Sequence, residues 1–95
     1  MTPEFMQALT PDALKALLEA KEKLEATPDD ATKIGKVIWH ETTEQAQIVP
    51  VLIYEDGTRQ KLPDWREPLP LVGSLVRYGF IGAKRKEVAE VIFRR

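Results

Sequence analysis

The sequence predicts an α+β fold in which an N-terminal amphipathic helix precedes a small antiparallel sheet of about five strands. Two observations lead to this prediction. Apolar residues recur at helical spacing before residue 34 and at the two-residue spacing of strands after it. The chain has 95 residues, which is enough for one hydrophobic core. We therefore expect a helical segment over residues 1–33 and a small antiparallel β domain over residues 34–95, joined in one folding unit.

The helical prediction rests on residues 11–26, PDALKALLEAKEKLEA. The apolar residues of this segment share an arc of roughly 160° at 100° per residue. They are Ala13, Leu14, Leu17, Leu18, Ala20 and Leu24. Thr10, Pro11 and Asp12 supply a capping hydroxyl, a proline at the first helical position and an acid near the positive end of the helix dipole. The apolar arc is expected to pack on the sheet, or else to bind a partner helix or a second copy of the chain.

Two segments after the helix read as β structure. Residues 36–41, KVIWHE, are rich in the β-branched and aromatic side chains that strands favour. Residues 46–62 predict a hairpin, because an Asp-Gly pair near their middle favours a tight turn. Pro50 interrupts the first arm and indicates a sheet edge or a bulge. Residues 63–73 hold several prolines and are expected to form a stiff, extended connection.

The next predicted strand covers residues 75–81, LVRYGFI, with Val76, Tyr78 and Phe80 on one face. The final segment, residues 83–95, fits either a strand or a helix. We favour the strand, because its basic residues would oppose the dipole at a helix N-terminus. Valine, isoleucine and phenylalanine are also better strand formers than helix formers.

As a strand, the final segment would place Ala89, Val91 and Phe93 opposite the apolar face of residues 75–81. Five short strands in about 60 residues match the size and strand number of an SH3-like or OB-like barrel. The sequence therefore predicts a curled sheet, with closure into a small barrel as one form of it.

Charge is distributed unevenly along the chain, although the formal net charge is only −1. Residues 1–33 carry seven acids and four bases, for a net charge of −3. Residues 34–73 carry six acids and four bases, for a net charge of −2, whereas residues 74–95 carry two acids and six bases, for a net charge of +4. This pattern suits ion pairing inside the molecule as well as binding to an external partner.

Composition also indicates the cellular compartment. The chain has no cysteine, which excludes disulfides, thiolate nucleophiles and cysteine-ligated zinc. It shows no signal-peptide pattern and no apolar run near the ~20 residues of a membrane span. We therefore expect a cytoplasmic protein without membrane contact.

Catalytic chemistry is not indicated by the residue pattern. His40 is the only histidine, and it alternates with Trp39 in a predicted strand, which favours a place on the sheet surface. Carboxylate pairs lie in predicted turns, caps and loops, and no phosphate-binding glycine motif occurs. We expect a protein that is not an enzyme, with no catalytic residue, no metal site and no cofactor.

Trp65 and Arg66 are the predicted protein-binding residues. They lie on the proline-stiffened connection, and tryptophan and arginine are the side chains most enriched at binding hot spots. A rigid loop also loses little entropy when it docks. The alternative is that Trp65 folds back and fills one open end of the sheet.

A basic patch is predicted near the end of the chain, for nucleic acid or for an acidic protein surface. It comprises Arg77, Lys84, Arg85, Lys86, Arg94 and Arg95. Tyr78 and Phe80 are close in sequence and would offer stacking surfaces. The sequence pI of about 5.8 is far from that of a dedicated nucleic-acid binder, and the alternative is a solvated loop and terminus.

These observations predict a small non-enzymatic binding or adaptor protein that engages another protein or a larger complex. Accessory subunits, regulators and phage-type components are typical of this size and composition. The alternative function is a nucleic-acid-binding small β-barrel that uses the basic C-terminal segment.

Overall fold

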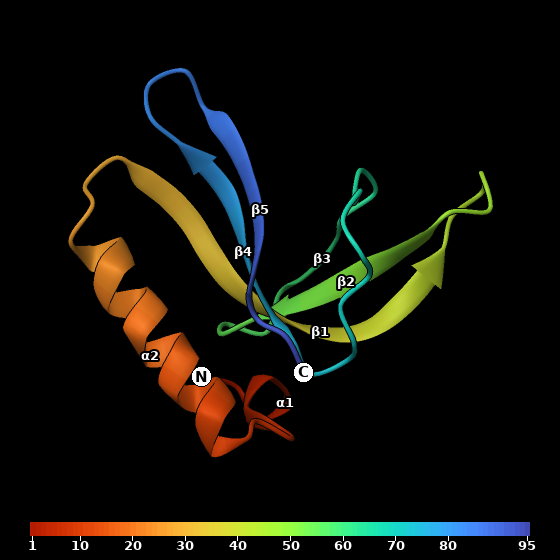
Figure 1. Cartoon of the computed structure of the whole chain (residues 1–95), viewed down its shortest axis with the longest axis horizontal. Helices are drawn as coiled ribbons and strands as arrows, with labels where there is room; N and C mark the ends of the chain where they lie inside the picture. Colours follow the sequence, from red (N-terminus) through yellow and green to blue (C-terminus); the bar gives the residue numbers. More distant parts are fainter.

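The structure is a computed structural model that describes residues 1–95, and it contains two helices and one antiparallel sheet of five strands (Figure 1). The elements are α1 (Pro3–Met6), α2 (Pro11–Glu25), β1 (Asp30–Thr42), β2 (Ile48–Tyr54), β3 (Arg59–Lys61), β4 (Leu75–Ile81) and β5 (Lys86–Phe93). The strand order is β3-β2-β1-β4-β5. The predicted α+β fold is confirmed. The end strands β3 and β5 do not pair with each other, so the sheet is not closed into a barrel.

α2 forms over the segment whose apolar spacing predicted a helix. Thr10 Oγ1 accepts a hydrogen bond from the backbone N–H of Ala13 at 3.2 Å, and Pro11 occupies the first turn. Ala13 and Leu17 are buried against the sheet. Most of the apolar arc of α2 therefore faces the sheet, whereas Leu18, at its margin, is exposed. Neither helix is long and apolar enough to cross a membrane.

β1 is the central strand, and it pairs with β4 on one side and with β2 on the other. Residues 30–36 pair with β4, and residues 35–42 pair with β2. A bulge between Val37 and Trp39 shifts the register with β2 by one residue. β1 is longer at both ends than the six residues that the sequence predicted. Figure 1 shows two arms of the sheet: the first half of β1 runs beside β4 and β5, and its second half runs beside β2 and β3.

The final segment forms strand β5 and not a helix. Tyr78 pairs with Ala89, and Val76 pairs with Val91, as the predicted hairpin requires. A register shift between Leu75 and Val76 then places Phe93 opposite Leu75. Phe93 therefore packs against the helical side of the sheet, away from the face that the sequence predicted.

A hydrophobic cluster lies on each face of the sheet. The first cluster contains residues from both helices and from β1, β2 and β4: Phe5, Ala13, Leu17, Ile34, Ile53 and Leu75. The second lies on the opposite face: Val37, Leu52, Tyr54, Leu62, Trp65 and Val76. Side chains alternate between the faces, so neighbouring residues of β2 serve different clusters. The connection after β3 covers the second cluster, as the helices cover the first.

The connection between β3 and β4 has no helix or strand, as predicted, and backbone hydrogen bonds tie it to β1. Gly73 N donates to Val37 O at 2.8 Å, and Val37 N donates to Ser74 O at 2.9 Å. His40 Nε2 lies 2.7 Å from Pro70 O. These contacts hold the connection along the second half of β1, on the side that β4 leaves free.

Lys36 is the one charged residue buried in the fold. Its Nζ donates hydrogen bonds to Glu4 O at 2.7 Å and Gln7 O at 2.5 Å, the carbonyls at the end of α1. Burial lowers the pKa of Lys36, although the charge of Glu4 acts in the opposite direction. Lys36 thus fastens α1 to the central strand.

Candidate functional site

Trp65 lies inside the fold. Its side chain is 7% exposed and belongs to the second cluster, below the connection that carries it. The indole N–H is buried and has no hydrogen-bond partner. In this conformation Trp65 fills the open side of the sheet, which is the alternative role that the sequence allowed. Its ring packs in the core and therefore leaves little surface for a partner to contact.

Arg66 is exposed beside Trp65 and borders a hollow of about 460 Å³ between the connection and β5. Three acids, Asp64, Glu67 and Glu87, share this hollow with Arg66. The two predicted protein-binding residues therefore differ in exposure to solvent. Arg66 is on the surface, whereas Trp65 is below it.

Arg77 belongs to an ion-pair network inside the molecule. Its Nη2 lies 2.7 Å from Asp30 Oδ2, and its Nη1 lies 3.3 Å from Glu90 Oε2. Its Nε donates to Thr32 Oγ1 at 3.0 Å. These acceptors use three of the five donors of its guanidinium, and binding of Arg77 to an external acidic partner stays a prediction.

Asp30 anchors this network. Its side chain is only 5% exposed, and Thr32 donates to it from both the backbone N–H and the hydroxyl. Burial by itself would raise the pKa of Asp30, but the hydrogen bonds from Thr32 and the charge of Arg77 outweigh it and lower the pKa. The carboxylate therefore stays ionised where the sheet meets the end of α2.

The other predicted basic residues lie at opposite ends of the β4–β5 hairpin. Lys84, Arg85 and Lys86 are exposed at its tip, where Arg85 lies 4.9 Å from the centroid of the Phe80 ring. Arg94 and Arg95 follow the last residue of β5. A seven-residue strand spans about 23 Å at its usual rise, so the two groups do not form one surface.

Arg95 is fixed at the end of the chain. Its backbone N–H donates to Ser74 Oγ at 3.0 Å, and its Nη1 donates to Val72 O at 3.4 Å. Gly73 has a φ of +98°, and a Cβ at this position would lie 2.8 Å from Arg95 Cδ. The glycine thus leaves room for the arginine side chain.

The exposed tryptophan is Trp39, which the sequence analysis did not select as a binding residue. Trp39 is 39% exposed, and the Arg59 guanidinium lies 5.0 Å from its ring centroid. Glu4 Oε1 holds Arg59 at 2.5 Å. A hollow of about 400 Å³ extends from Trp39 to Val72 and Arg95. We call Trp39, Arg59, Val72 and Arg95 the Trp39 surface.

The bulge in β1 explains the position of Trp39. Strict alternation would place Trp39 on the same face as Val37, in the second cluster. The extra residue instead pairs Trp39 with Val51, whose side chain points to the helical side of the sheet together with that of Ile53. The helices cover only part of that side, so the indole ring remains exposed. Neither the bulge nor the extent of the helical layer has a clear signal in the sequence.

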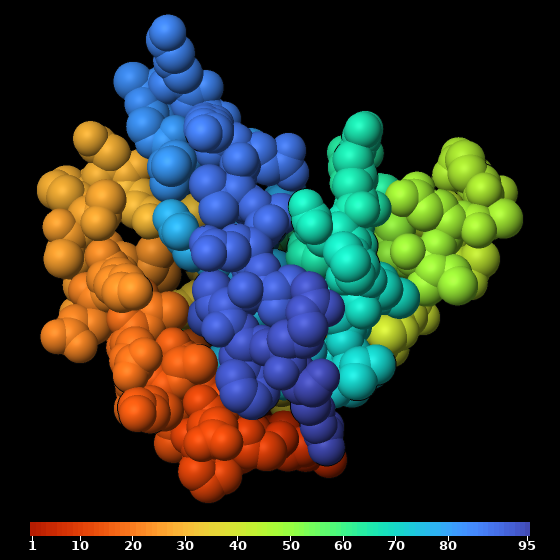
Figure 2. Space-filling model, in the orientation of Figure 1, coloured from red at the N-terminus to blue at the C-terminus, as the bar shows by residue number.

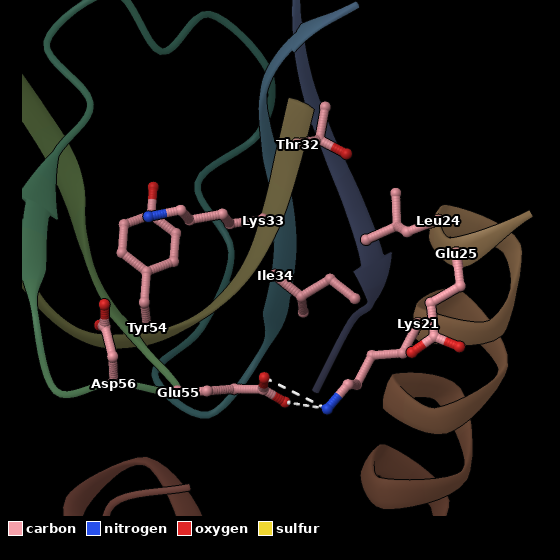
Figure 3. Close-up of a pocket in the computed structure, with 9 residues that line it drawn as sticks. All are labelled: Lys21, Leu24, Glu25, Thr32, Lys33, Ile34, Tyr54, Glu55 and Asp56. Atoms are coloured by element: carbon pink, nitrogen blue, oxygen red, sulfur yellow. Dashed lines mark hydrogen bonds and ion pairs between the residues drawn. The ribbon is translucent and has the colours of Figure 1, made fainter. Parts of the chain in front are cut away.

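Figure 3 shows a second hollow, of about 330 Å³, where β1 and β2 diverge beside α2. Lys21 and Glu55 close one end with an ion pair of 3.0 Å. Lys33 extends over the ring of Tyr54, with Nζ 5.5 Å from the centroid. Lys21, Glu55 and Lys33 thus face partners within the chain.

Tyr54 is the most strongly perturbed titrating group in this region. Burial, reinforced by Tyr78 and Asp56, raises the pKa of Tyr54 to about 12. The hydroxyl donates to Gln60 Oε1 at 2.6 Å, which requires the protonated phenol. The arrangement holds the tip of β2 against β3 and does not resemble an acid–base centre.

No group of three or more histidine, cysteine, aspartate and glutamate side chains is placed to hold a metal ion. No family model, curated protein or solved structure matches this chain.

Proposed function

We propose that this chain is a small non-enzymatic binding protein that engages a protein of a larger assembly through the Trp39 surface. The observation that supports this function best is the exposed, stacked pair of Trp39 and Arg59. Tryptophan and arginine are among the side chains most enriched at the hot spots of protein interfaces. Val72 is 44% exposed and lines the same hollow.

The Trp39 surface is also held in place before any partner arrives. Trp39 lies on a paired strand, and Glu4 restrains Arg59. Arg95 is bonded to Ser74 and Val72. Little side-chain entropy is therefore lost on binding, which leaves more of the contact energy for affinity.

The charges of the Trp39 surface favour one kind of partner. Arg59 shares its charge with Glu4, whereas no carboxylate pairs with Arg95. A partner segment that places an apolar side chain in the hollow and a carboxylate beside Arg95 would match it. The proposed partner is a protein with an apolar anchor next to an acidic residue.

The test compares two exposed apolar residues of this chain. Immobilised protein is used to capture partners from the native source, with wild type, Trp39→Ala, Arg95→Glu and Leu18→Ala in parallel. Leu18 is 54% exposed on α2 and serves as the matched control. We expect Trp39→Ala to lose the captured protein, Arg95→Glu to weaken capture, and Leu18→Ala to retain it. Equal capture by Trp39→Ala and wild type would refute the proposal.

Nucleic-acid binding is the second candidate, and the tip of the β4–β5 hairpin favours it. Arg85 stacks on Phe80, which meets Tyr78 edge to face at 6.3 Å, and both aromatic rings are half-buried. Cations beside partly open aromatic rings suit a single-stranded nucleic acid. Fluorescence anisotropy with a random-sequence oligonucleotide at 50 mM salt tests this. We expect binding that the Lys84/Arg85/Lys86→Ala variant abolishes, and an absence of binding by wild type removes this candidate.

A further inference from the structure

β5 is a long sheet edge with no neighbour on its outer side. Its eight residues pair only with β4, whereas the opposite edge, β3, has three residues, all polar or charged. A long edge strand presents unpaired backbone groups to which another strand can bond. Figure 2 shows the dark blue atoms of this segment as an unbroken surface that no other element crosses.

The hydrogen bonds beyond the two ends of the β1–β4 ladder show how β4 is oriented. Val37 N donates to Ser74 O at one end, and Gly82 N donates to Asp29 O at the other. Both bonds join an odd-numbered residue on the β1 side to an even-numbered residue on the β4 side. Because backbone direction alternates along an antiparallel strand, the even residues of β4 face β1 and the odd residues face β5.

The register of β4 with β5 then fixes the outward groups of β5. From the register shift to the turn, the odd residues Arg77, Gly79 and Ile81 of β4 are paired with even residues of β5. The backbone N–H and C=O groups of Glu87, Ala89 and Val91 therefore point away from the sheet. No hydrogen bond outside the ladders uses any of these groups.

There is space beside both faces of β5. A hollow of about 360 Å³ lies between α2 and the face that carries Glu90 and Ile92. The hollow of about 460 Å³ beside Arg66 lies against the face that carries Glu87 and Ala89. The side chains of an added strand alternate between two faces, so both must have room for it.

We propose that β5 pairs with β5 of a second copy of this chain, antiparallel and with Val88 opposite Val88 of the second copy. The two sheets then join into one. In this register Glu87 and Ala89 exchange backbone hydrogen bonds with Ala89 and Glu87 of the second copy. Lys86 lies opposite Glu90 of the second copy, and symmetry repeats this pair.

Charge selects this register among those that keep the outward groups bonded. A register centred on Glu87 would place two glutamates opposite each other, and one centred on Ala89 would make no charge pair. The register centred on Val88 puts Lys86 and Glu90 at non-hydrogen-bonded positions, where side chains of opposite strands are closest. The sequence of β5 is therefore complementary to itself.

The mass of the wild-type protein in solution is the first test. Sedimentation at increasing concentration should show a species of twice 10.8 kDa. A chain that stays monomeric throughout would overturn the proposal and leave the edge to a strand of another protein. Trp39→Ala should dimerise like wild type, so failure of this proposal is distinct from failure of the proposed function.

A charge exchange identifies the register. Lys86→Glu creates two pairs of facing glutamates and should weaken dimerisation at least about tenfold. The double variant Lys86→Glu/Glu90→Lys restores opposite charges between the two copies and should dimerise more tightly than Lys86→Glu, although it removes the Arg77–Glu90 ion pair within each copy. Lys84→Glu makes the same charge change outside the paired residues and should have little effect. Equal weakening by Lys84→Glu, or no recovery in the double variant, would overturn the register.

Amide exchange provides a readout at single residues. The outward amides of Glu87 and Ala89 should become protected as the concentration rises through the dimerisation range. The inward amides of Val88 and Glu90 should be protected at every concentration. A dimer in which the amides of Glu87 and Ala89 stay unprotected would form through another surface and would contradict the proposal.

Discussion

At the scale of single residues, the ring of Trp65 packs with Leu52 and Val76, while its indole N–H finds no acceptor. We expect Trp65→Ala to lower the free energy of unfolding by about 3–5 kcal/mol, since it empties a core site. Trp65→Phe should cost less, because it keeps an aromatic ring and removes the unpaired donor. Urea unfolding monitored by circular dichroism measures both variants. A Trp65→Ala variant as stable as wild type would place Trp65 outside the core.

Tyr54 makes stability depend on alkaline pH. Its pKa in the folded protein is about 12, above the value of 10.0 for an ordinary tyrosine. The unfolded chain therefore loses this proton first, and the stabilisation is complete below pH 10.0 and lost as the pH rises towards 12. The difference is on the order of 2–3 kcal/mol for a buried group.

Urea unfolding at pH 9 and pH 12 measures this loss, and tyrosinate absorbance follows the titration. Tyr54→Phe should show a clearly smaller loss of stability over the same range. Lys36 acts in the opposite direction, because its lowered pKa favours the folded state as the pH rises towards 10.5. An equal loss in wild type and Tyr54→Phe would show that Tyr54 is not the cause.

The sequence could predict the chemistry of individual residues better than their surroundings. The sequence analysis selected a tryptophan beside an arginine in the chain, and the structure stacks a different pair, Trp39 and Arg59. These two residues are far apart in the chain and meet across three strands, so no local pattern joins them. The acids around Arg77 are equally distant in sequence, as the partners Asp30 and Glu90 show.

At the scale of elements, Gly79 controls how closely β4 approaches β1. Its φ is +149°, and a Cβ would lie 2.5 Å from Ala31 O and 2.7 Å from Thr32 Cα. Both obstacles are backbone atoms, which cannot move aside without disturbing the ladder. We expect Gly79→Ala to cost about 2–4 kcal/mol in the free energy of unfolding, through overpacking and backbone strain together.

Gly82→Ala is the matched control for this substitution. Gly82 also has a positive φ, of +76°, but a Cβ there would meet no atom within 4 Å. Gly82→Ala should lower the free energy of unfolding by about 1–2 kcal/mol, the cost of placing a non-glycine residue in the left-handed conformation. Thermal unfolding of both variants separates the two effects. Equal losses would mean that the contact with β1 contributes nothing beyond the backbone conformation.

Elements with strong local signals were predictable. The capped amphipathic segment gave α2, and the alternation in LVRYGFI gave β4. The two register shifts were not predictable, because they arise where β1 meets β2 and where β4 meets β5. These shifts determine which face of the sheet carries Trp39 and Phe93. Regular alternation along the sequence therefore assigns both side chains to the wrong face.

At the scale of the whole molecule, the helices and the sheet complete one core. Phe5, Ala13 and Leu17 supply half of the first cluster, and Ile34, Ile53 and Leu75 supply the other half. A fragment of residues 28–95 would expose that half of the core to water. We expect the fragment to lack a cooperative thermal transition by circular dichroism.

Adding a peptide of residues 1–27 should restore the transition of the fragment if the helices act only by covering the sheet. A fragment that unfolds cooperatively without the peptide would show that residues 28–95 form an independent domain. The helices would then contribute only an accessory layer.

The α+β class of the whole molecule could be predicted because one change of spacing separates its helical and strand segments. Whether the sheet closes could not be predicted, because closure depends on whether β3 and β5 meet. The sequence holds no signal for the sheet curvature that would bring these two strands together. The uneven charge contributes one pair between the first and last thirds, Asp30 with Arg77. The remaining C-terminal bases form no ion pair.

The sharing of β1 also bears on how quickly the chain reaches its native state. The β1–β2 and β4–β5 hairpins each join segments close in sequence, and such hairpins form within microseconds. Their docking along residues 30–36 must first close a loop of several dozen residues, and topologies with such distant pairings fold more slowly. We expect the encounter of the two hairpins to limit the folding rate, so substitutions along that seam should slow refolding more than substitutions within either turn.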